Sequence, residues 1–262
     1  MHYLDDEKSI IESFQSVRCN SVYFPAENSD VVNAFESIYD PEKWKNWKDS
    51  AGKADPPPDF YSDTYLTMME VMRVDDHSYK NKKGKVVNPT NMHIRDVEKE
   101  IEKSGLMDMF PNAKLHINAF TDLPTEKDHN YKFYYKNFVR IVEHHKKRIK
   151  LYKANHPKHK LIFFVMDESS AYFKVHDIEV VKKCREIDEQ IEGQPHFHFL
   201  DRHFLDVFIN SKIDYFIWYT PFKFLCSTEG KFDLPQVCVF DTRKMPDEYI
   251  EYDADYMISA EI

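Results

Sequence analysis

The sequence predicts an α/β fold with a mixed central sheet flanked by helices. Three observations lead to this prediction: short apolar runs typical of strands, longer segments with apolar residues at helical spacing, and the alternation of the two along the chain. The 262 residues are 42% hydrophobic and 15% aromatic, which suffices for a large core. We expect a single α/β domain over residues 1–262, with its core at about 29–221 and a C-terminal extension at 222–262.

The first half of the chain alternates helices with strands. Apolar residues at helical spacing predict helices over about 5–18 and 31–38. A short strand is expected at 21–24, and the run 65–74 is strand-like in length and composition. The other elements expected in this half are a helix at about 94–110 and a strand at 115–120.

The second half begins with the longest expected helix, over about 130–155, which has one apolar stripe. The run 160–166 is apolar on both faces, so we expect it to be central in the sheet. The remaining expected elements are strands at 171–174, 196–200 and 215–219, an edge strand at 237–240, and helices at 177–192 and 201–210.

Composition and simple motifs exclude several classes of protein. The chain has only five glycines and neither GxGxxG nor GxxxxGK[ST], so we do not expect a nucleotide-cofactor enzyme. Its four cysteines form no CxxC pair, so neither a zinc ribbon nor a dense disulfide framework is indicated. No apolar run approaches transmembrane length, and the N-terminus lacks the pattern of a signal peptide. We therefore expect a cytoplasmic protein with no membrane partner.

Charge is unevenly distributed along the chain. The net charge is -9, yet the range 129–160 holds ten Lys or Arg and one acid, Glu143. Such segregation predicts a positively charged face that contacts the phosphate backbone of a nucleic acid. The alternative is a lysine-rich helix face that is simply solvated. The residues expected to make the contact are Arg140, Lys146, Lys147, Arg148 and Lys150.

The candidate catalytic residues lie between Pro56 and Asp76. Asp59 follows the prolines of a turn, and Glu70 lies in the middle of an apolar run. A buried carboxylate is tolerated only if it is paired, hydrogen-bonded or bound to a cation, and two carboxylates together suit a divalent ion such as Mg²⁺. In the alternative interpretation Asp59 is an ordinary turn residue, and Glu70 faces outward and pairs with Arg73 or a lysine.

The order of these elements resembles the PD-(D/E)xK, or restriction-endonuclease-like, nuclease superfamily over about residues 29–221. The features that match are a helix with Glu36, the turn with Pro58 and Asp59, the strand with Glu70 and a later central strand. The resemblance implies a nuclease that hydrolyses phosphodiester bonds of DNA or RNA with Mg²⁺ or Mn²⁺. It makes Asp59 and Glu70 metal ligands and Glu36 an auxiliary ligand. A homodimer is a further expectation, because similar enzymes often act as dimers.

The chain departs from the family pattern at the lysine two positions after the acid. That position is Met72, and the next cation, Arg73, points to the opposite face of the strand from Glu70. Some members of the superfamily recruit this lysine from elsewhere, so we expect the lysine-rich loop 80–85, with Lys85, to assist the attacking water, and Lys99 is the alternative source. The alternative is a non-catalytic protein with a nuclease-like fold that binds a nucleic acid or another protein.

A second candidate metal site lies in His196-Phe197-His198, which is followed by Asp201 and His203. Histidines at positions i and i+2 of a strand share a face, a usable geometry for Zn²⁺ or Mn²⁺. The motif is superficially similar to the HxHxDH signature of the metallo-β-lactamase family, with one residue inserted. It provides a further alternative function, a His-ligated metal hydrolase, while the other interpretation is that these histidines pack in the core.

The acid pair Asp167-Glu168 ends the expected central strand. Polar groups at the carboxyl ends of strands are typical of ligand sites in α/β folds. If the protein is a nuclease, we expect this pair near the edge of the site. Otherwise it caps a helix or lies in a solvated turn.

Overall fold

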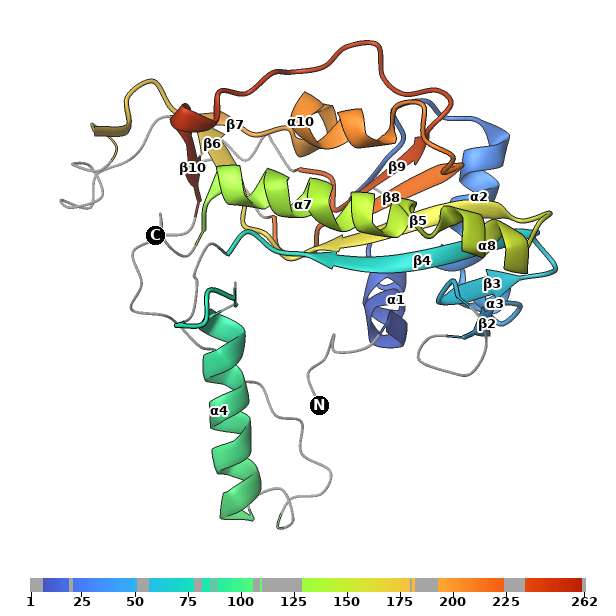
Figure 1. Ribbon diagram of the computed structural model, residues 1–262, viewed down its shortest axis with the longest axis horizontal. Coiled ribbons are helices and arrows are strands. Elements are labelled where there is room, and N and C mark those ends of the chain that lie inside the picture. Colours follow the sequence, from blue (N-terminus) through green and yellow to red (C-terminus); the bar gives the residue numbers. More distant parts are fainter. Residues whose placement is uncertain are drawn as a thin grey trace.

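Seven strands form a mixed sheet at the centre of the computed structural model (Figure 1). The structure describes residues 7–18, 21–50, 57–77, 82–85, 87, 89–105, 109, 129–179, 181, 193–223 and 234–260. The strands of the sheet are β1 (Val22–Tyr23), β2 (Lys48–Asp49), β3 (Phe60–Ser62), β4 (Thr67–Val74), β5 (Lys160–Asp167), β8 (Tyr215–Tyr219) and β9 (Val237–Asp241). Helices flank this sheet, so the predicted fold class is confirmed.

The strand order is β1-β9-β8-β5-β4-β3-β2, and β5 is its middle strand, as its apolar sequence predicts. β4, β5 and β8 are parallel to one another, whereas β3 pairs antiparallel with β4 and β9 pairs antiparallel with β8. The expected edge position of the strand at 237–240 is wrong. β9 lies between β8 and β1, because the short strand Val22–Tyr23 pairs along its outer side.

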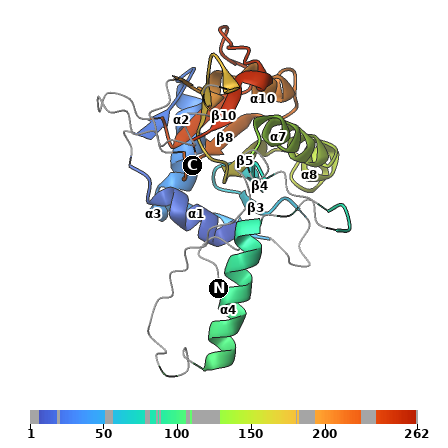
Figure 2. The ribbon, with the colours of Figure 1, turned by 90° about the vertical axis from the view of Figure 1, so that its left-hand side faces the viewer.

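Helices cover both faces of the sheet (Figures 1 and 2). Alternate residues of β4 point to opposite faces, so Met69 and Val71 join one apolar core while Met68 and Met72 join the other. Glu70 is two residues from both Met68 and Met72, so its side chain points to the same face of the sheet as theirs. The first core is covered by α1 (Glu7–Gln15), α2 (Ser29–Tyr39) and α3 (Pro41–Trp44), and the second by α7 (Tyr131–Lys146), α8 (Ile149–Asn155) and α10 (Arg202–Leu205).

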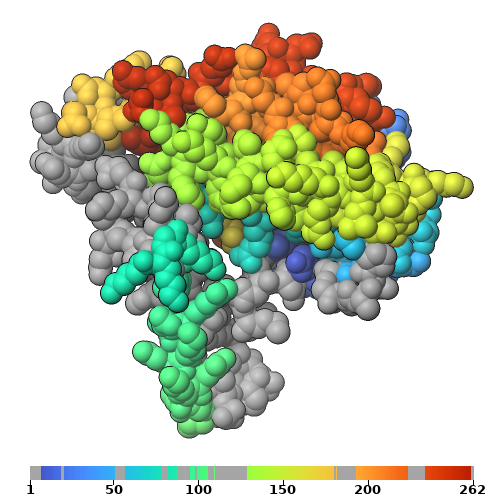
Figure 3. Space-filling model, viewed as in Figure 1, coloured from blue at the N-terminus to red at the C-terminus, as the bar shows by residue number. Residues whose placement is uncertain are grey.

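The expected long helix at 130–155 consists of two helices, α7 and α8. Asn130 caps the start of α7, where its side-chain oxygen accepts a hydrogen bond from Phe133 N (3.0 Å). Lys147 and Arg148 separate the two helices, and the Arg148 main-chain N–H donates to His145 O at 2.9 Å. The two helices form a continuous band along one side of the molecule (Figure 3).

A second, smaller sheet lies beyond the carboxyl end of β5. It contains β10 (Met257–Ser259), β6 (Tyr172–Lys174) and β7 (Gln194–Pro195), paired antiparallel in that order. The expected strand at 196–200 is wrong, because His198–Leu200 form a 3-10 helix after β7. This turn brings Asp201 back to His196, whose Nε2 lies 2.6 Å from Asp201 Oδ2.

α4 (Pro89–Ser104) stands away from the sheet (Figures 1 and 2). It begins five residues earlier than expected, at a proline, a residue favoured in the first turn of helices. It ends before Gly105, whose φ of 69° is typical of the residue after a helix. Within the described part of the chain, none of the helices combines the length and apolar character needed to cross a bilayer. The expected strand at 115–120 and most of the expected helix at 177–192 lie outside the described residues.

Candidate functional site

Asp59 and Glu70 lie on neighbouring parts of a β-hairpin. In this hairpin Phe60 is opposite Met69, and continuing the same register by one residue places Asp59 opposite Glu70. Residues opposite one another in an antiparallel pair have Cβ atoms about 4.5–5.5 Å apart. The hairpin therefore brings together the two acids that the sequence singles out.

Asp59 has few donors for its carboxylate. Oδ2 accepts one hydrogen bond, from the main-chain N–H of Val71 at 2.8 Å. Burial raises the pKa of Asp59, and the negative charge of Glu70 raises it further, to about 7, against the smaller lowering effects of the Val71 bond and His145. Near neutral pH the Asp59 carboxyl is therefore close to its titration midpoint. The raised pKa indicates an excess of negative charge around Asp59 and Glu70.

Glu70 is 2% exposed and is only partly satisfied. Its Oε1 lies 2.6 Å from His145 Nδ1 and 3.4 Å from Arg148 Nη1. Its Oε2 is buried and makes no hydrogen bond of standard geometry in the described part of the chain, and neither does the Tyr152 hydroxyl, although this hydroxyl lies close enough to Glu70 to interact with it weakly. Burial and the charge of Glu70 raise the pKa of Tyr152, so this hydroxyl stays protonated. A buried carboxylate oxygen without a donor is unusual, and a bound cation would satisfy it.

The site reaches the surface beside the junction of α7 and α8. The side chains of His145 and Arg148 are 20% and 42% exposed, and Asp59 is partly exposed. His145 and Arg148 are three residues apart, the spacing that puts helical side chains on one face, although Arg148 itself follows the end of α7. Asp59, His145 and Arg148 are thus partly exposed on the helix side, whereas Glu70 between them is buried.

Two other residues expected at this site lie elsewhere. Glu36 is on α2, which covers the opposite face of the sheet, and its carboxylate pairs with Lys43 at 2.5 Å. Lys85 lies in the exposed segment 82–85, beyond the carboxyl end of β4. The basic side chains that contact Glu70 among the described residues are His145 and Arg148. The sequence signal that could have identified His145 is its helical spacing from the buried residues of α7.

The expected nucleic-acid contacts divide into two groups. Arg148 contacts Glu70, and the Lys146 ammonium donates to the Val207 main-chain carbonyl at 2.7 Å, so both are engaged within the protein. The others lie on the outer surface of α7 and α8 or at their junction. The expected contact residues that are exposed are Arg140, Lys147 and Lys150.

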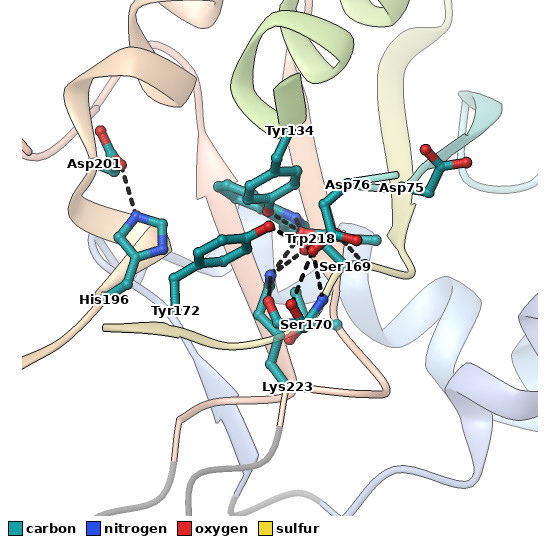
Figure 4. Close-up of polar contacts among 12 residues, drawn as sticks. Asp75, Asp76, Tyr134, Ser169, Ser170, Tyr172, His196, Asp201, Trp218 and Lys223 are labelled. Carbon is teal, nitrogen blue, oxygen red and sulfur yellow. Dashed lines mark hydrogen bonds and ion pairs between the residues drawn. The ribbon is translucent and has the colours of Figure 1, made fainter. Parts of the chain in front are cut away.

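A second group of polar side chains lies at the carboxyl ends of β4 and β5 (Figure 4). Asp76 is fully buried and accepts hydrogen bonds from the hydroxyls of Tyr172 (2.6 Å) and Ser170 (2.9 Å) and from Ser170 N (3.2 Å). His129 Nδ1 lies 2.8 Å from its other oxygen. Burial alone would raise the pKa of Asp76, but the contacts with His129 and Tyr172 lower it to about 2.

Asp76, His77 and His129 form a group that could hold a metal ion. Each offers one ligand atom, and the three atoms lie within 4.8 Å of one another. Within the described residues this is the only such group of three or more side chains, so Glu36 does not complete a three-residue group with Asp59 and Glu70.

The expected metal site at His196 and His198 is also not formed among the described residues. His196 Nε2 bonds to Asp201, and the His198 ring packs against Trp218 with 4.8 Å between ring centroids. Burial lowers the pKa of His198 well below its ordinary value, so the ring is neutral. His196 and His198 are therefore better described as histidines that pack in the core.

Asp167 belongs to the same buried region rather than to a solvated turn. Its carboxylate accepts hydrogen bonds from the Tyr134 hydroxyl, Trp218 Nε1 (2.9 Å) and Ser169 N (2.9 Å). The buried Lys223 ammonium lies 3.5 Å from it and donates to the Ser169 hydroxyl. Burial lowers the pKa of Lys223, while the charge of Asp167 opposes that effect. The sequence places Asp167 correctly at a strand end, but its partners come from distant parts of the chain.

Comparisons of the chain with models of protein families, with curated protein sequences and with solved structures give no match. The function of this protein is therefore inferred from its side chains. Two features are available for that inference, the Asp59 and Glu70 pair and the group of Asp76, His77 and His129.

Proposed function

We propose that this protein is a metal-dependent nuclease in which Asp59 and Glu70 bind Mg²⁺ or Mn²⁺. The observation that carries the proposal is the pair of adjacent carboxylates, one with a pKa of about 7 and the other with a buried oxygen that makes no hydrogen bond of standard geometry among the described residues. A cation held between the two carboxylates would offset the negative charge that raises the pKa of Asp59, and it would coordinate Glu70 Oε2. Carboxylate oxygens are the ligands that these hard cations prefer, so the donor set fits the ion.

The bound ion would lower the pKa of a coordinated water and offset charge that develops on a phosphodiester oxygen. The neighbouring side chains have separate tasks. His145 holds Glu70 Oε1 and so orients the carboxylate with Oε2 free. Arg148 is only loosely bound to Glu70, at 3.4 Å, and is 42% exposed, so its guanidinium can approach a substrate phosphate. Arg148 thus takes the place of the absent motif lysine as the source of positive charge.

A nucleic-acid substrate is supported by the exposed positive charges next to Arg148. Lys147 and Lys150 are exposed and lie beside Arg148 at the junction of α7 and α8. A phosphate backbone that reaches Asp59 and Glu70 from this side would pass these cations. Contacts of this kind position a nucleic acid without selecting a base sequence.

The test is cleavage of labelled single- and double-stranded DNA and RNA by the purified protein with Mg²⁺ or Mn²⁺. Asp59→Asn and Glu70→Gln should each lower metal-dependent cleavage by at least about 100-fold, because each removes a charged ligand. Glu36→Gln is the matched control, since Glu36 is an acid on the opposite face of the sheet, and it should retain activity. Metal-dependent cleavage that survives both ligand substitutions, or no cleavage of any of the four substrates, would refute the proposal.

The second candidate function is nucleic-acid binding without cleavage. It is favoured by Met72, which occupies the position of the motif lysine, and by the exposed cations Lys147 and Lys150. In this case Lys147→Glu with Lys150→Glu should abolish binding, whereas Asp59→Asn should bind as well as the unaltered protein. Binding that is unaffected by the charge reversals would exclude this function.

A further inference from the structure

We infer that Asp76, His77 and His129 bind a second metal ion, of the zinc class, that ties the two ends of segment 78–128 to the sheet. This inference does not depend on the proposed nuclease function. It rests on three features of the described residues: where the chain leaves and re-enters the fold, the chemistry of the three ligands, and the groups that hold Asp76 in place.

The chain leaves the sheet and returns to it at one place. His77 and His129 form an isolated antiparallel bridge, with 4.7 Å between their ring centroids. The Asn130 main-chain N–H donates to Asp76 O at 3.1 Å. The intervening segment contains α4, which stands away from the sheet (Figures 1 and 2).

The ligand set suits a borderline divalent cation. Two imidazoles and one carboxylate are typical ligands of Zn²⁺ and related transition metals, whereas Mg²⁺ prefers oxygen alone. Ligand atoms bound to one tetrahedral zinc ion at about 2.0–2.2 Å lie about 3.3–3.6 Å apart. The three ligand atoms lie within 4.8 Å of one another, so a shift of about 1 Å in the more distant side chains would complete the site.

Asp76 is oriented for this role by groups behind it. The Tyr172 and Ser170 hydroxyls both donate to Oδ2, at 2.6 and 2.9 Å, and leave Oδ1 directed towards His129. Metal sites in proteins commonly hold their ligands by such outer hydrogen bonds. An ion bound by Oδ1 and the His129 ring would replace the 2.8 Å contact between them.

An ion at this site would cross-link the two ends of segment 78–128. It would bind residues on both sides of segment 78–128, and the unfolded chain cannot hold these ligands together without losing loop-closure entropy. Binding to the folded state alone raises its stability. The predicted role is therefore structural, and distinct from that of the ion proposed at Asp59 and Glu70.

The test is a titration of the chelator-treated full chain with Zn²⁺ and, as a spectroscopic probe, Co²⁺. We expect one equivalent of tightly bound Zn²⁺, visible absorption bands of Co²⁺ with histidine ligands, and a higher thermal unfolding midpoint with Zn²⁺. Glu70→Gln should bind Zn²⁺ unchanged, which separates this site from the carboxylate pair. Absence of a one-equivalent site, or Zn²⁺ binding without any rise in the midpoint, would overturn the inference.

Variants locate the site. His77→Ala and His129→Ala should each weaken Zn²⁺ binding by about 100-fold or more, and Tyr172→Phe by about tenfold, since it removes only an outer hydrogen bond. His176→Ala is the matched control, because His176 is exposed and lies outside the group. If either histidine variant fails to fold, Tyr172→Phe still decides the question. Equal Zn²⁺ affinity in all of these variants would overturn the inference.

Discussion

Asp59 and Asp76 are the same residue type in two poorly hydrated places, yet their pKa values are about 7 and about 2. Asp76 has donors for both oxygens, from His129, Ser170 and Tyr172. Asp59 has one main-chain donor and a negatively charged neighbour, Glu70. The comparison shows that hydrogen-bond partners, rather than burial itself, decide whether an aspartate stabilises the fold or leaves room for a ligand to do so.

The largest effect on stability is expected at Asp76, the aspartate whose two oxygens both have hydrogen-bond partners. Asp76→Ala would remove the acceptor of the buried Tyr172 hydroxyl and the contacts of Asp76 with Ser170 and His129. We expect it to lower the free energy of unfolding by about 3–5 kcal/mol, measured by denaturant titration with a chelator present. Asp59→Ala is the control and should not lower the free energy of unfolding at neutral pH. A loss below about 1 kcal/mol for Asp76→Ala would contradict the proposed difference between the two aspartates.

A smaller effect is expected from the pH dependence of Asp59. Its pKa is raised from 3.8 to about 7, so between these values the folded protein keeps a proton that the unfolded chain has lost. Stability from this group is therefore present at low pH and falls as the pH rises from about 4 to about 7. Asp59→Asn should remove this fall and, without divalent cations, gain about 1–2 kcal/mol at pH 8. A parallel decline in the variant would show that Asp59 is not the group responsible.

Added Mg²⁺ should offset the excess negative charge of the Asp59 and Glu70 carboxylates. At ten times its dissociation constant, the ion should stabilise the unaltered protein at pH 8 by about 1.4 kcal/mol, measured as a rise in the unfolding midpoint. Glu70→Gln should show no such rise, because it removes a charged ligand. An equal rise in both proteins would mean that Mg²⁺ binds elsewhere.

The smallest effect on stability is expected at Arg148. Its contact with Glu70 is long and partly exposed, so Arg148→Ala should change the free energy of unfolding by less than about 1 kcal/mol. Cleavage should nevertheless fall at least about tenfold, because the charge near the phosphate is lost. Lys147→Ala is the matched control and should affect substrate affinity more than the catalytic rate. Unchanged cleavage by Arg148→Ala would assign it a structural role.

The fold could be predicted where one pattern dominates locally. The apolar runs of β4, β5 and β8 identify the buried strands, and the run without polar alternation identifies the central one, β5. The pattern failed at residues 196–200, where alternating His and Phe are typical of a strand. There, hydrogen bonding of the buried His196 to Asp201 requires a turn and overrides the alternation.

The candidate site could be predicted only in part, for a related reason. Asp59 and Glu70 are joined by a short hairpin, so their proximity follows from nearby residues. His145 approaches Glu70 from α7, which is distant in sequence, and nothing in the local pattern pairs them. His129 and Asp76 are likewise brought together only by the tertiary fold. Partners of this kind are set by helix docking, which sequence periodicity does not specify.

The bridge between His77 and His129 also bears on which connections between β4 and α7 the fold can accommodate. Because the ends of segment 78–128 meet side by side, a two-residue turn of the kind that joins adjacent antiparallel strands could replace everything between them. The central sheet would keep its register after such an exchange. The pairing of His77 with His129 is thus compatible with connections of different length between β4 and α7.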